Sequence, residues 1–396
     1  MRIGINGRFL VAKRTGVQRA AYNLIKTLIK IDRENEYFIF TGQDQVGNED
    51  WAYDNVQVIA SKIRSGESFR NHVWEQFTLP RLARKYRVDL LHSPANMAPL
   101  FFKGKSIVHI HDLCFVVNPQ WYSFSFHTLY NFVIPRLVKR ATRIITNSNN
   151  SRNDIFQYCG VSAGRVSLIY WAVDEMFLKN TLAEPVEDED YILYVGSLEP
   201  RKNIRSLVEA YEKLREHRSE ITTKLVLIGG ESPLFGVVRL NAKKYKDDVL
   251  FKGFVNDKEL VDYYKKARLV VYPSLYEGFG LPPLEAMASG TPVVTSNTSS
   301  IPEVVGDAAL MVNPYDTDQL AKTMESVLVD DDLRRRLVEK GFAQVQKYNW
   351  YRVARNVLAV YYEVGASGDR SQKSDECYLP REQWRHFLDL EKNRSI

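Results

Sequence analysis

The sequence predicts an α/β protein made of two Rossmann-like, doubly wound domains whose strand ends face a central cleft. Its 396 residues exceed what one ordinary hydrophobic core organises. Short apolar runs alternate with helical patterns, and this alternation stops once, in an acidic segment, before it restarts. Such alternation is typical of a parallel sheet covered by helices on both faces, which binds ligands at the carboxyl ends of its strands.

The first domain is expected over residues 1–180. Its final helical pattern runs through 137–143 into the last strand. Helical spacing of apolar residues predicts further helices over 17–31 and 73–86, the second interrupted by Pro80. Apolar runs predict strands at 2–7, 36–42, 55–60, 88–93, 106–112 and 143–148.

The segment 181–190 separates the halves. It is acidic, contains Pro185 and lacks apolar periodicity, so we interpret it as the interdomain linker.

The second domain is expected over residues 191–350. A last helix over 351–365 could cross back to the first domain, and residues 366–396 lose periodicity and are expected to form a loosely attached tail. Strands are predicted at 191–197, 224–230, 248–254, 269–274 and 292–296, and helices at 203–218, 257–267 and 282–289. The stretch 317–348 is expected to form one or two helices.

Composition narrows the class of protein. No apolar stretch reaches the roughly 18–20 residues that a membrane-spanning helix needs. The N-terminus has the pattern of a first strand rather than of a signal peptide. The three cysteines, Cys114, Cys159 and Cys377, are far apart, which argues against a disulfide framework or a zinc site and favours a reducing cytosol.

Charge is distributed unevenly along the chain. Residues 1–182 carry 24 Lys and Arg against 14 Asp and Glu, while the remainder carries 30 against 34. The basic half could face nucleic acid, a phosphorylated lipid or an acidic membrane, or it could be only a solvated basic surface.

The segment 273–292 is the most informative part of the chain. An apolar strand enters a loop with two glycines, and Pro282 and Pro283 then occupy a first helical turn, where a missing N–H costs nothing. The loop 278–281 therefore lies at a helix N-terminus, which is a ready anion site. Glu277 and Glu285 bracket it, which suits a phosphate flanked by polyols, as in a nucleoside-diphosphate sugar. Alternatively, Glu277 decorates a turn and Glu285 is a solvated helix residue.

With this segment the chain resembles the family-4 retaining glycosyltransferases of the GT-B fold, to about residue 363. The resemblance is carried by 277–294 and 195–204, by the triplet at 111–113, and by Gly16 with Arg19. It implies a hexosyltransferase that needs no cofactor and no metal. The acidic residues 188–190 resemble an Asp-x-Asp metal motif, but they precede a strand instead of following one.

The resemblance assigns roles in donor binding. Glu277 would contact hydroxyls of the transferred sugar, and Glu285 would hold the ribose. Arg201 and Lys202 would neutralise the diphosphate, and Arg201 would act alone as the bidentate contact because Ser197 stands where many relatives carry arginine. Main-chain amides at Phe279, Gly280 and Leu281 would hold the distal phosphate and the sugar, and Gly278 would belong to the same donor-binding loop. The base is expected near Phe254 and Val255.

The first domain would complete the site and bind the acceptor. By resemblance, His111 lines the reaction centre, although a lone histidine on a strand is more often structural. Gly16 can present its N–H to the diphosphate from the opposite domain. We expect Asp112 either to orient His111 or to contact the acceptor. We expect Trp121 and Tyr122 to contact the acceptor, with the aromatic run 121–132 forming core as the alternative. The catalytic set would be His111, Glu277, Arg201 and Lys202.

The resulting hypothesis is a retaining hexosyltransferase of cell-surface polysaccharide synthesis. It would move a hexose, with mannose from GDP-mannose preferred, to a glycan or a polyprenyl-diphosphate-linked acceptor. Basic residues over 62–87 and the aromatic run suit an anionic membrane, which predicts a cytoplasmic protein peripheral to the inner face of the cell membrane. The alternatives are a sugar-nucleotide epimerase or phosphorylase of the same fold and a nucleic-acid-binding protein, for which no motif is found.

Overall fold

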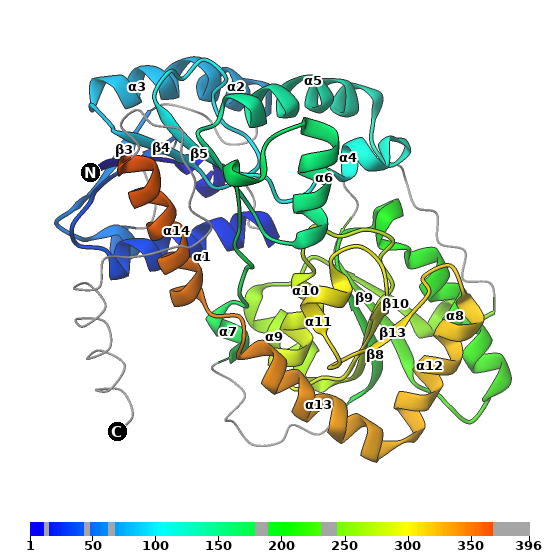
Figure 1. The fold of residues 1–396 in the computed structure, drawn as a ribbon. Coiled ribbons are helices and arrows are strands. Elements are labelled where there is room, and N and C mark those ends of the chain that lie inside the picture. Colours follow the sequence, from blue (N-terminus) through cyan, green and yellow to red (C-terminus); the bar gives the residue numbers. More distant parts are fainter. Residues whose placement is uncertain (12–15, 43–47, 62–67, 179–188, 231–243, 367–396) are drawn as a thin grey trace, which may run out of the picture.

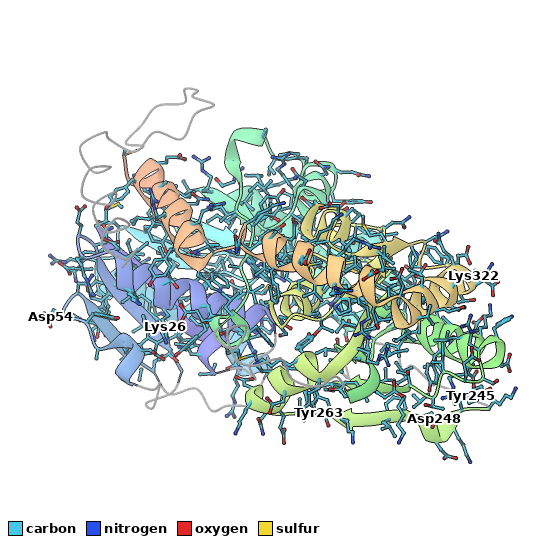
Figure 2. All side chains as sticks on the ribbon, turned by 90° about the horizontal axis from the view of Figure 1, so that it is seen from below. Lys26, Asp54, Tyr245, Asp248, Tyr263 and Lys322 are labelled. Carbon is cyan, nitrogen blue, oxygen red and sulfur yellow. The ribbon has the colours of Figure 1, made fainter. Side chains whose placement is uncertain are left out.

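A computed structural model describes residues 1–11, 16–42, 48–61, 68–178, 189–230 and 244–366. It contains two fully parallel sheets, with strand orders β3-β2-β1-β4-β5-β6-β7 and β10-β9-β8-β11-β12-β13. The two halves lie side by side (Figure 1), and from below Lys26 and Asp54 lie in one half while Tyr245, Asp248 and Lys322 lie at the far end of the other (Figure 2). The predicted fold class is confirmed.

The elements follow the predicted alternation. The strands are β1 (Arg2–Asn6), β2 (Glu36–Thr41), β3 (Val56–Ala60), β4 (Leu90–Ser93), β5 (Lys105–His109), β6 (Arg143–Thr146), β7 (Val166–Leu168), β8 (Glu189–Val195), β9 (Lys224–Ile228), β10 (Val249–Gly253), β11 (Ala267–Tyr272), β12 (Val293–Ser296) and β13 (Leu310–Val312). The α-helices are α1 (Gly16–Ile31), α2 (Ser68–Val73), α3 (Leu79–Lys85), α4 (Cys114–Val117), α5 (Phe124–Arg140), α6 (Asn149–Cys159), α7 (Glu175–Leu178), α8 (Ile204–His217), α9 (Asp257–Lys266), α10 (Leu281–Ala288), α11 (Ile301–Val305), α12 (Thr317–Val329), α13 (Asp331–Val345) and α14 (Trp350–Ala366). Shorter turns are η1 (Gly7–Leu10), η2 (Asn48–Trp51), the π-helical η3 (Trp74–Thr78), η4 (Pro119–Trp121), η5 (Ala163–Arg165), η6 (Pro200–Lys202) and η7 (Lys246–Asp248).

Two predicted elements differ in detail, and a third, left open as one or two helices, is decided by the structure. The strand expected over 106–112 ends at His109, so His111 lies in the loop beyond it. Pro80 does not interrupt a helix: it occupies the first turn of α3, after the π-helical η3. The long pattern over 317–348 is two helices, because Asp330 caps α13 by accepting from the Leu333 N–H.

The hydrophobic core explains how the last helix is held. One cluster of buried side chains runs from α1 through the second sheet to α14 without a break. α14 packs against α1 of the first half (Figure 1), and its Tyr361 hydroxyl lies 2.5 Å from Nδ1 of His92 in β4. The chain segment after the second sheet therefore returns to the first. Most of the segment 181–190 lies outside the described residues, and β8 begins at Glu189.

The two carboxyl edges meet where parallel sheets bind ligands. The loop after β11 of the second sheet touches the loop after β5 of the first. At Gly278 a Cβ atom would lie 2.5 Å from the His111 carbonyl oxygen and 2.9 Å from the Asp112 Cβ, so the backbones approach as closely as glycine permits.

Candidate active site

The loop between β11 and α10 is held by hydroxyl groups of the loop that follows β12. Ser300 Oγ donates to the carbonyls of Glu277 and Phe279 at 2.9 Å each, and the Glu277 N–H donates to Ser299 Oγ at 2.9 Å. Thr298 Oγ1 donates to the carbonyls of Ser274 and Leu275. These contacts fix the loop before any ligand binds.

Unsatisfied main-chain donors line this loop. Gly280, with φ +111°, is the N-cap of α10, and Leu281 begins the helix. No acceptor within the described segments takes the N–H groups of Gly278, Phe279, Gly280 or Leu281. The loop predicted from its glycines and prolines therefore has the donors of an anion site.

A buried charge cluster lies beside the loop. Glu277 accepts from Lys202 Nζ at 2.7 Å, from Arg201 Nη1 at 3.1 Å and from the Tyr272 hydroxyl at 2.8 Å. Burial alone would raise the pKa of Glu277, but Lys202 and Arg201 outweigh it and hold this pKa at about 2. The structure thus brings Glu277 to the adjacent Arg201 and Lys202, which lie 76 and 75 positions earlier in the sequence.

The same cluster occupies the arginine. Arg201 Nε donates to Glu199 Oε2 at 3.0 Å, and Ser197 Oγ donates to the other Glu199 oxygen. The guanidinium that was expected to face a diphosphate is therefore paired with Glu199 and Glu277 in this structure. Sequence reasoning missed Glu199, whose position two residues before Arg201 was the available signal.

His111 contributes its main chain and its ring in different directions. Its carbonyl oxygen accepts from Ser151 Oγ at 2.8 Å, next to Gly278. Its Nε2 lies 3.0 Å from the Pro94 carbonyl, and its buried Nδ1 has no partner in the described structure. Burial, partly opposed by the Pro94 contact, lowers the pKa of His111 to about 3, so the ring is neutral and Nδ1 is free to accept.

Asp112 lies at the same junction. Its Oδ1 accepts from the Cys114 N–H at 3.0 Å. Burial raises the pKa of Asp112, while Arg201 across the interface lowers it and Glu277 and Glu199 raise it. Asp112 therefore interacts electrostatically with the Glu277 cluster.

Glu285 lies on the buried side of α10. It accepts from the Tyr264 hydroxyl at 2.9 Å. Burial raises the pKa of Glu285, and Arg19 of α1 lowers it from the opposite half. Arg19 also bridges the halves through an ion pair with Asp257 at 2.6 Å. Gly16, at the start of α1, faces the same region, since a Cβ there would lie 3.8 Å from Leu281 Cδ1.

The remaining predicted contacts divide between surface and core. The Phe254 ring is 62% exposed and covers Gly230, and Val255 is half-buried beside it, so both lie at the rim of the second sheet. Tyr122 stacks on Phe126 at 5.3 Å and packs against a buried cluster, which favours the core alternative for this residue. Trp121 is half-buried in η4.

A polar cluster in the first half was missed from the sequence. Glu75, fully buried in η3, accepts from Asn6 Nδ2 at 2.7 Å and from Arg8 Nη1 at 2.9 Å, and His72 packs on the same guanidinium. Burial raises the pKa of Glu75, with Arg8 opposing it. A π-helical turn and a buried carboxylate are frequent at functional sites, but neither is visible as a sequence pattern.

The described residues contain no group of three or more His, Cys, Asp or Glu side chains arranged to hold a metal ion. Among them, too, no helix has the length and apolar character that crossing a bilayer requires.

Comparison with known proteins follows the two halves of the chain. The family model "Glycosyltransferase Family 4" matches residues 14–176, and "Glycosyl transferases group 1" matches residues 181–344. O-antigen chain mannosyltransferase B of Escherichia coli is 31% identical over 290 residues, which are 70% of this chain and 75% of that protein. Serotype-specific mannosyltransferase WbdA of Escherichia coli is 32% identical over 279 residues, 66% of this chain but 33% of that longer protein. The structure of Anabaena Alr3699/HepE in complex with UDP-glucose has a TM-score of 0.68 at 17% identity, covering 92% of this chain and 100% of that one.

Proposed function

The chain belongs to the family-4, group 1 glycosyltransferases, and from that premise we propose that it transfers mannose from GDP-mannose, with retention, to a lipid-linked or oligosaccharide acceptor in O-antigen- or capsule-type synthesis. The observation that carries the proposal is the set of unsatisfied amides at 278–281 beside the Arg201–Lys202–Glu277 cluster, facing His111. The mannosyl choice is supported by the names of the relatives in Escherichia coli. UDP-glucose is the second candidate donor.

The cluster suggests how the donor is held. Arg201 and Lys202 are paired with Glu277 and Glu199, so two buried cations are already in place beside two carboxylates. A diphosphate at 278–281 would draw Lys202 and Arg201 away from Glu277. The released carboxylate would then accept hydroxyl hydrogens of the sugar, while Glu285 holds the ribose and Phe254 with Val255 flank the base.

Transfer then needs no protein nucleophile. The acceptor hydroxyl oxygen forms the new bond to the anomeric carbon as the bond to the diphosphate breaks. The leaving phosphate oxygen takes the acceptor proton from the same face, and the amides and cations stabilise the charge it gains. His111 and Asp112 would border the reacting carbon, with Arg8 and His72 available to the acceptor on the first-domain side and the buried Glu75 holding Arg8 in place.

Thermal shift with nucleotides tests the donor site. GDP and GDP-mannose should raise the melting temperature by mass action, and more than UDP, UDP-glucose or dTDP do. Lys202→Ala and Glu285→Ala should abolish the shift. Glu277→Ala should retain most of it while reducing turnover. No shift with any nucleotide would contradict the proposal.

The product tests the chemistry. An α-linked product from an α-linked donor is expected, in the presence of chelator as in its absence, and an inverted anomer would rule out same-face attack. Incubation of the donor without acceptor tests the epimerase alternative, which predicts a changed sugar and no free nucleotide.

We propose further that one face of the first half rests on an anionic membrane, which would make the enzyme cytoplasmic and peripheral. α2, α3 and α5 lie along the edge of the molecule farthest from the second sheet (Figure 1). Large aromatic side chains are exposed on and beside them, with Phe77 and Phe101 stacked at 6.0 Å. The most exposed are Phe77 (50%), Phe101 (59%), Phe124 (85%) and Phe132 (56%). Aromatic rings of this kind insert at the headgroup level.

Unpaired cations accompany these rings. Arg84, Arg87 and Lys103 line a cavity of about 350 Å³ whose apolar walls include Phe101 and Phe102. No carboxylate of the described residues pairs with these three cations. Cations that lack protein partners and border exposed aromatics complement anionic headgroups.

Liposome cosedimentation tests this face. The protein should sediment with phosphatidylglycerol vesicles at low salt and not with phosphatidylcholine vesicles. Phe101→Ser with Phe124→Ser should reduce binding at least about fivefold, whereas Tyr315→Ser, which removes an exposed ring (74%) from the second half, should not. Equal binding to random oligonucleotides and vesicles would favour a nonspecific basic surface.

A further inference from the structure

The Glu303 carboxylate, in α11 of the second half, accepts several hydrogen bonds from residues of the first half. Its Oε2 accepts from the Asn149 N–H at 2.9 Å, from Asn149 Nδ2 at 2.9 Å and from the Tyr170 hydroxyl at 3.0 Å. Its Oε1 accepts from the Asn150 N–H at 3.1 Å. All four donors belong to the first half, while Glu303 belongs to the second.

The carboxylate sits at the N-terminus of α6. Ser148 caps this helix, and its first turn contains no acidic residue of its own. Glu303 thus supplies, from across the interface, the negative charge that favours a helix N-terminus and satisfies two of its free amides. No cation of the described residues pairs with Glu303, so these donors are what compensates its charge.

On the second-domain side, Glu303 is connected to the loop 277–281 between β11 and α10, here named the donor loop. α11 follows directly after Ser300, whose hydroxyl holds the carbonyls of Glu277 and Phe279. The Tyr348 hydroxyl, in the turn between α13 and α14, donates to the carbonyls of Glu303 and Val304 and so holds α11 in place. A displacement of Glu303 would therefore move the loop that carries the unsatisfied amides.

On the first-domain side, the same turn of α6 holds His111. Ser151 Oγ donates to the His111 carbonyl at 2.8 Å and to the Gly278 carbonyl at 3.3 Å. In the side-chain orientation that satisfies its amide group, Asn147 Nδ2 donates to the His111 carbonyl at 2.8 Å and to the Gly278 carbonyl at 3.2 Å. The first turn of α6 thus joins the two loops that meet at the site.

We propose that Glu303 is a positioning residue for sugar transfer: by gripping the N-terminus of α6 it holds the His111 loop against the donor loop in the reactive arrangement. It touches neither substrate. Its charge acts through α6, because neutral glutamine would turn an N–H₂ group toward donors and could not satisfy them all. Burial and the Glu303 contact raise the pKa of Tyr170 to about 12, so that hydroxyl remains a donor at neutral pH.

Hydrogen exchange of the full-length protein tests the grip without any knowledge of donor or acceptor. In Glu303→Gln, amides in the peptide 147–156 should exchange about tenfold faster than in the wild type. Small-angle scattering should give a larger radius of gyration. Glu303→Asp should restore part of both. Glu339→Gln, which neutralises an exposed glutamate of α13, should change neither.

A second variant approaches the contact from the other side and guards against misfolding of the first. Asn149→Pro removes the Asn149 N–H and its amide but places proline at the first helical position, where it is tolerated, after Ser148 in the extended conformation (φ −152°, ψ 157°). Its amide exchange rates and its radius of gyration should match those of Glu303→Gln. The double variant should show little additional effect, because both changes break one contact.

Kinetics separates positioning from stability. Both variants should lower kcat about tenfold with less than a threefold change in the donor KM, at a temperature well below their melting points. The proposal would be overturned if the amides 147–156 of Glu303→Gln exchanged at the wild-type rate. It would also be overturned if they exchanged faster while kcat stayed unchanged. If no sugar transfer is found for the wild type, the donor proposal fails, and the exchange and scattering results still decide whether Glu303 holds the two halves together.

Discussion

Lys202 shows at the scale of one residue how the site is balanced. Its side chain is 8% exposed and that of Glu277 is 7% exposed, so both charges are largely removed from water. Such a pair gives little net stability, but removing one partner leaves the other uncompensated, at a cost of about 3–5 kcal/mol. Lys202 also donates to Tyr272, so its charge holds a network rather than one contact.

Lys202→Met should lower the free energy of unfolding by about 3 kcal/mol, because Arg201 alone must then compensate Glu277 and Glu199. The pKa of Glu277 should rise, since Lys202 is the largest influence that lowers it. Chemical denaturation at pH 7 measures the change. Lys213→Met is the control: Lys213 pairs with Glu209 and Asp318 at the surface, and its loss should cost less than about 1 kcal/mol. Equal losses in the two variants would refute the buried-pair account.

At this scale the sequence was a good guide to loops and a poor one to partners. The glycines and prolines around 278–283 predicted the helix N-terminus with its free amides, since these residues have strong local preferences. The pairing of Glu277 with Lys202 and the carboxylate of Glu303 at α6 could not be predicted, because both depend on how distant segments pack. The roles of the site residues in catalysis stay predictions.

α14 shows what one element does for the whole. It begins after α13 of the second half and ends against α1 and β4 of the first (Figure 1). Its Tyr361 is fully buried, and its hydroxyl shares a hydrogen with Nδ1 of His92. This contact couples the last helix to the strand that lies next to β5, which leads to His111.

Tyr361→Phe should destabilise the protein by about 1–2 kcal/mol, because it leaves a buried His92 nitrogen without its partner. Tyr362→Phe is a matched control one residue away: its hydroxyl bonds Glu34 at the surface, and its loss should cost less than about 0.5 kcal/mol. Thermal unfolding of both variants measures the difference. A smaller effect at Tyr361 than at Tyr362 would mean that α14 is held by apolar packing alone.

Long elements were predicted well because apolar periodicity marks them. α8 and β9 match their predicted ranges within a few residues. Short elements were missed, among them β7, β13 and α11, since three to five residues carry too little pattern. α6 was missed for another reason: it is mostly polar, with Ile155 among its few buried residues, and its Ser148 and Gly160 caps were the available signals.

For the molecule as a whole, neutral buried histidines make stability depend on pH. Burial lowers the pKa of His92 and of His111 from the usual 6.5 to about 3. These histidines therefore bind protons near pH 6.5 in the unfolded chain but only near pH 3 in the folded chain. The free energy of unfolding is therefore highest above pH 6.5 and decreases as the pH falls toward 3. Glu277 adds a loss between pH 4.5 and about 2.

The melting temperature should accordingly fall steeply from pH 6.5 to pH 4. His92→Gln should make the melting temperature less dependent on pH, because it removes one histidine that is protonated in the unfolded chain but not in the folded chain. His217→Gln, which replaces an exposed imidazole, should keep the wild-type profile. A scanning calorimetry series measures all three proteins, and a flat wild-type profile would contradict the proposed origin.

Because Gly278 has no side chain, the size of the residue at this position determines how closely the two halves can approach. Only a hydrogen atom fits between that residue and the His111 carbonyl. Alanine, serine and valine there would act as spacers of increasing size, each stopping the approach earlier while leaving the cationic pair untouched. Such a series of variants would separate nucleotide binding from the closer approach of the two halves that sugar transfer requires.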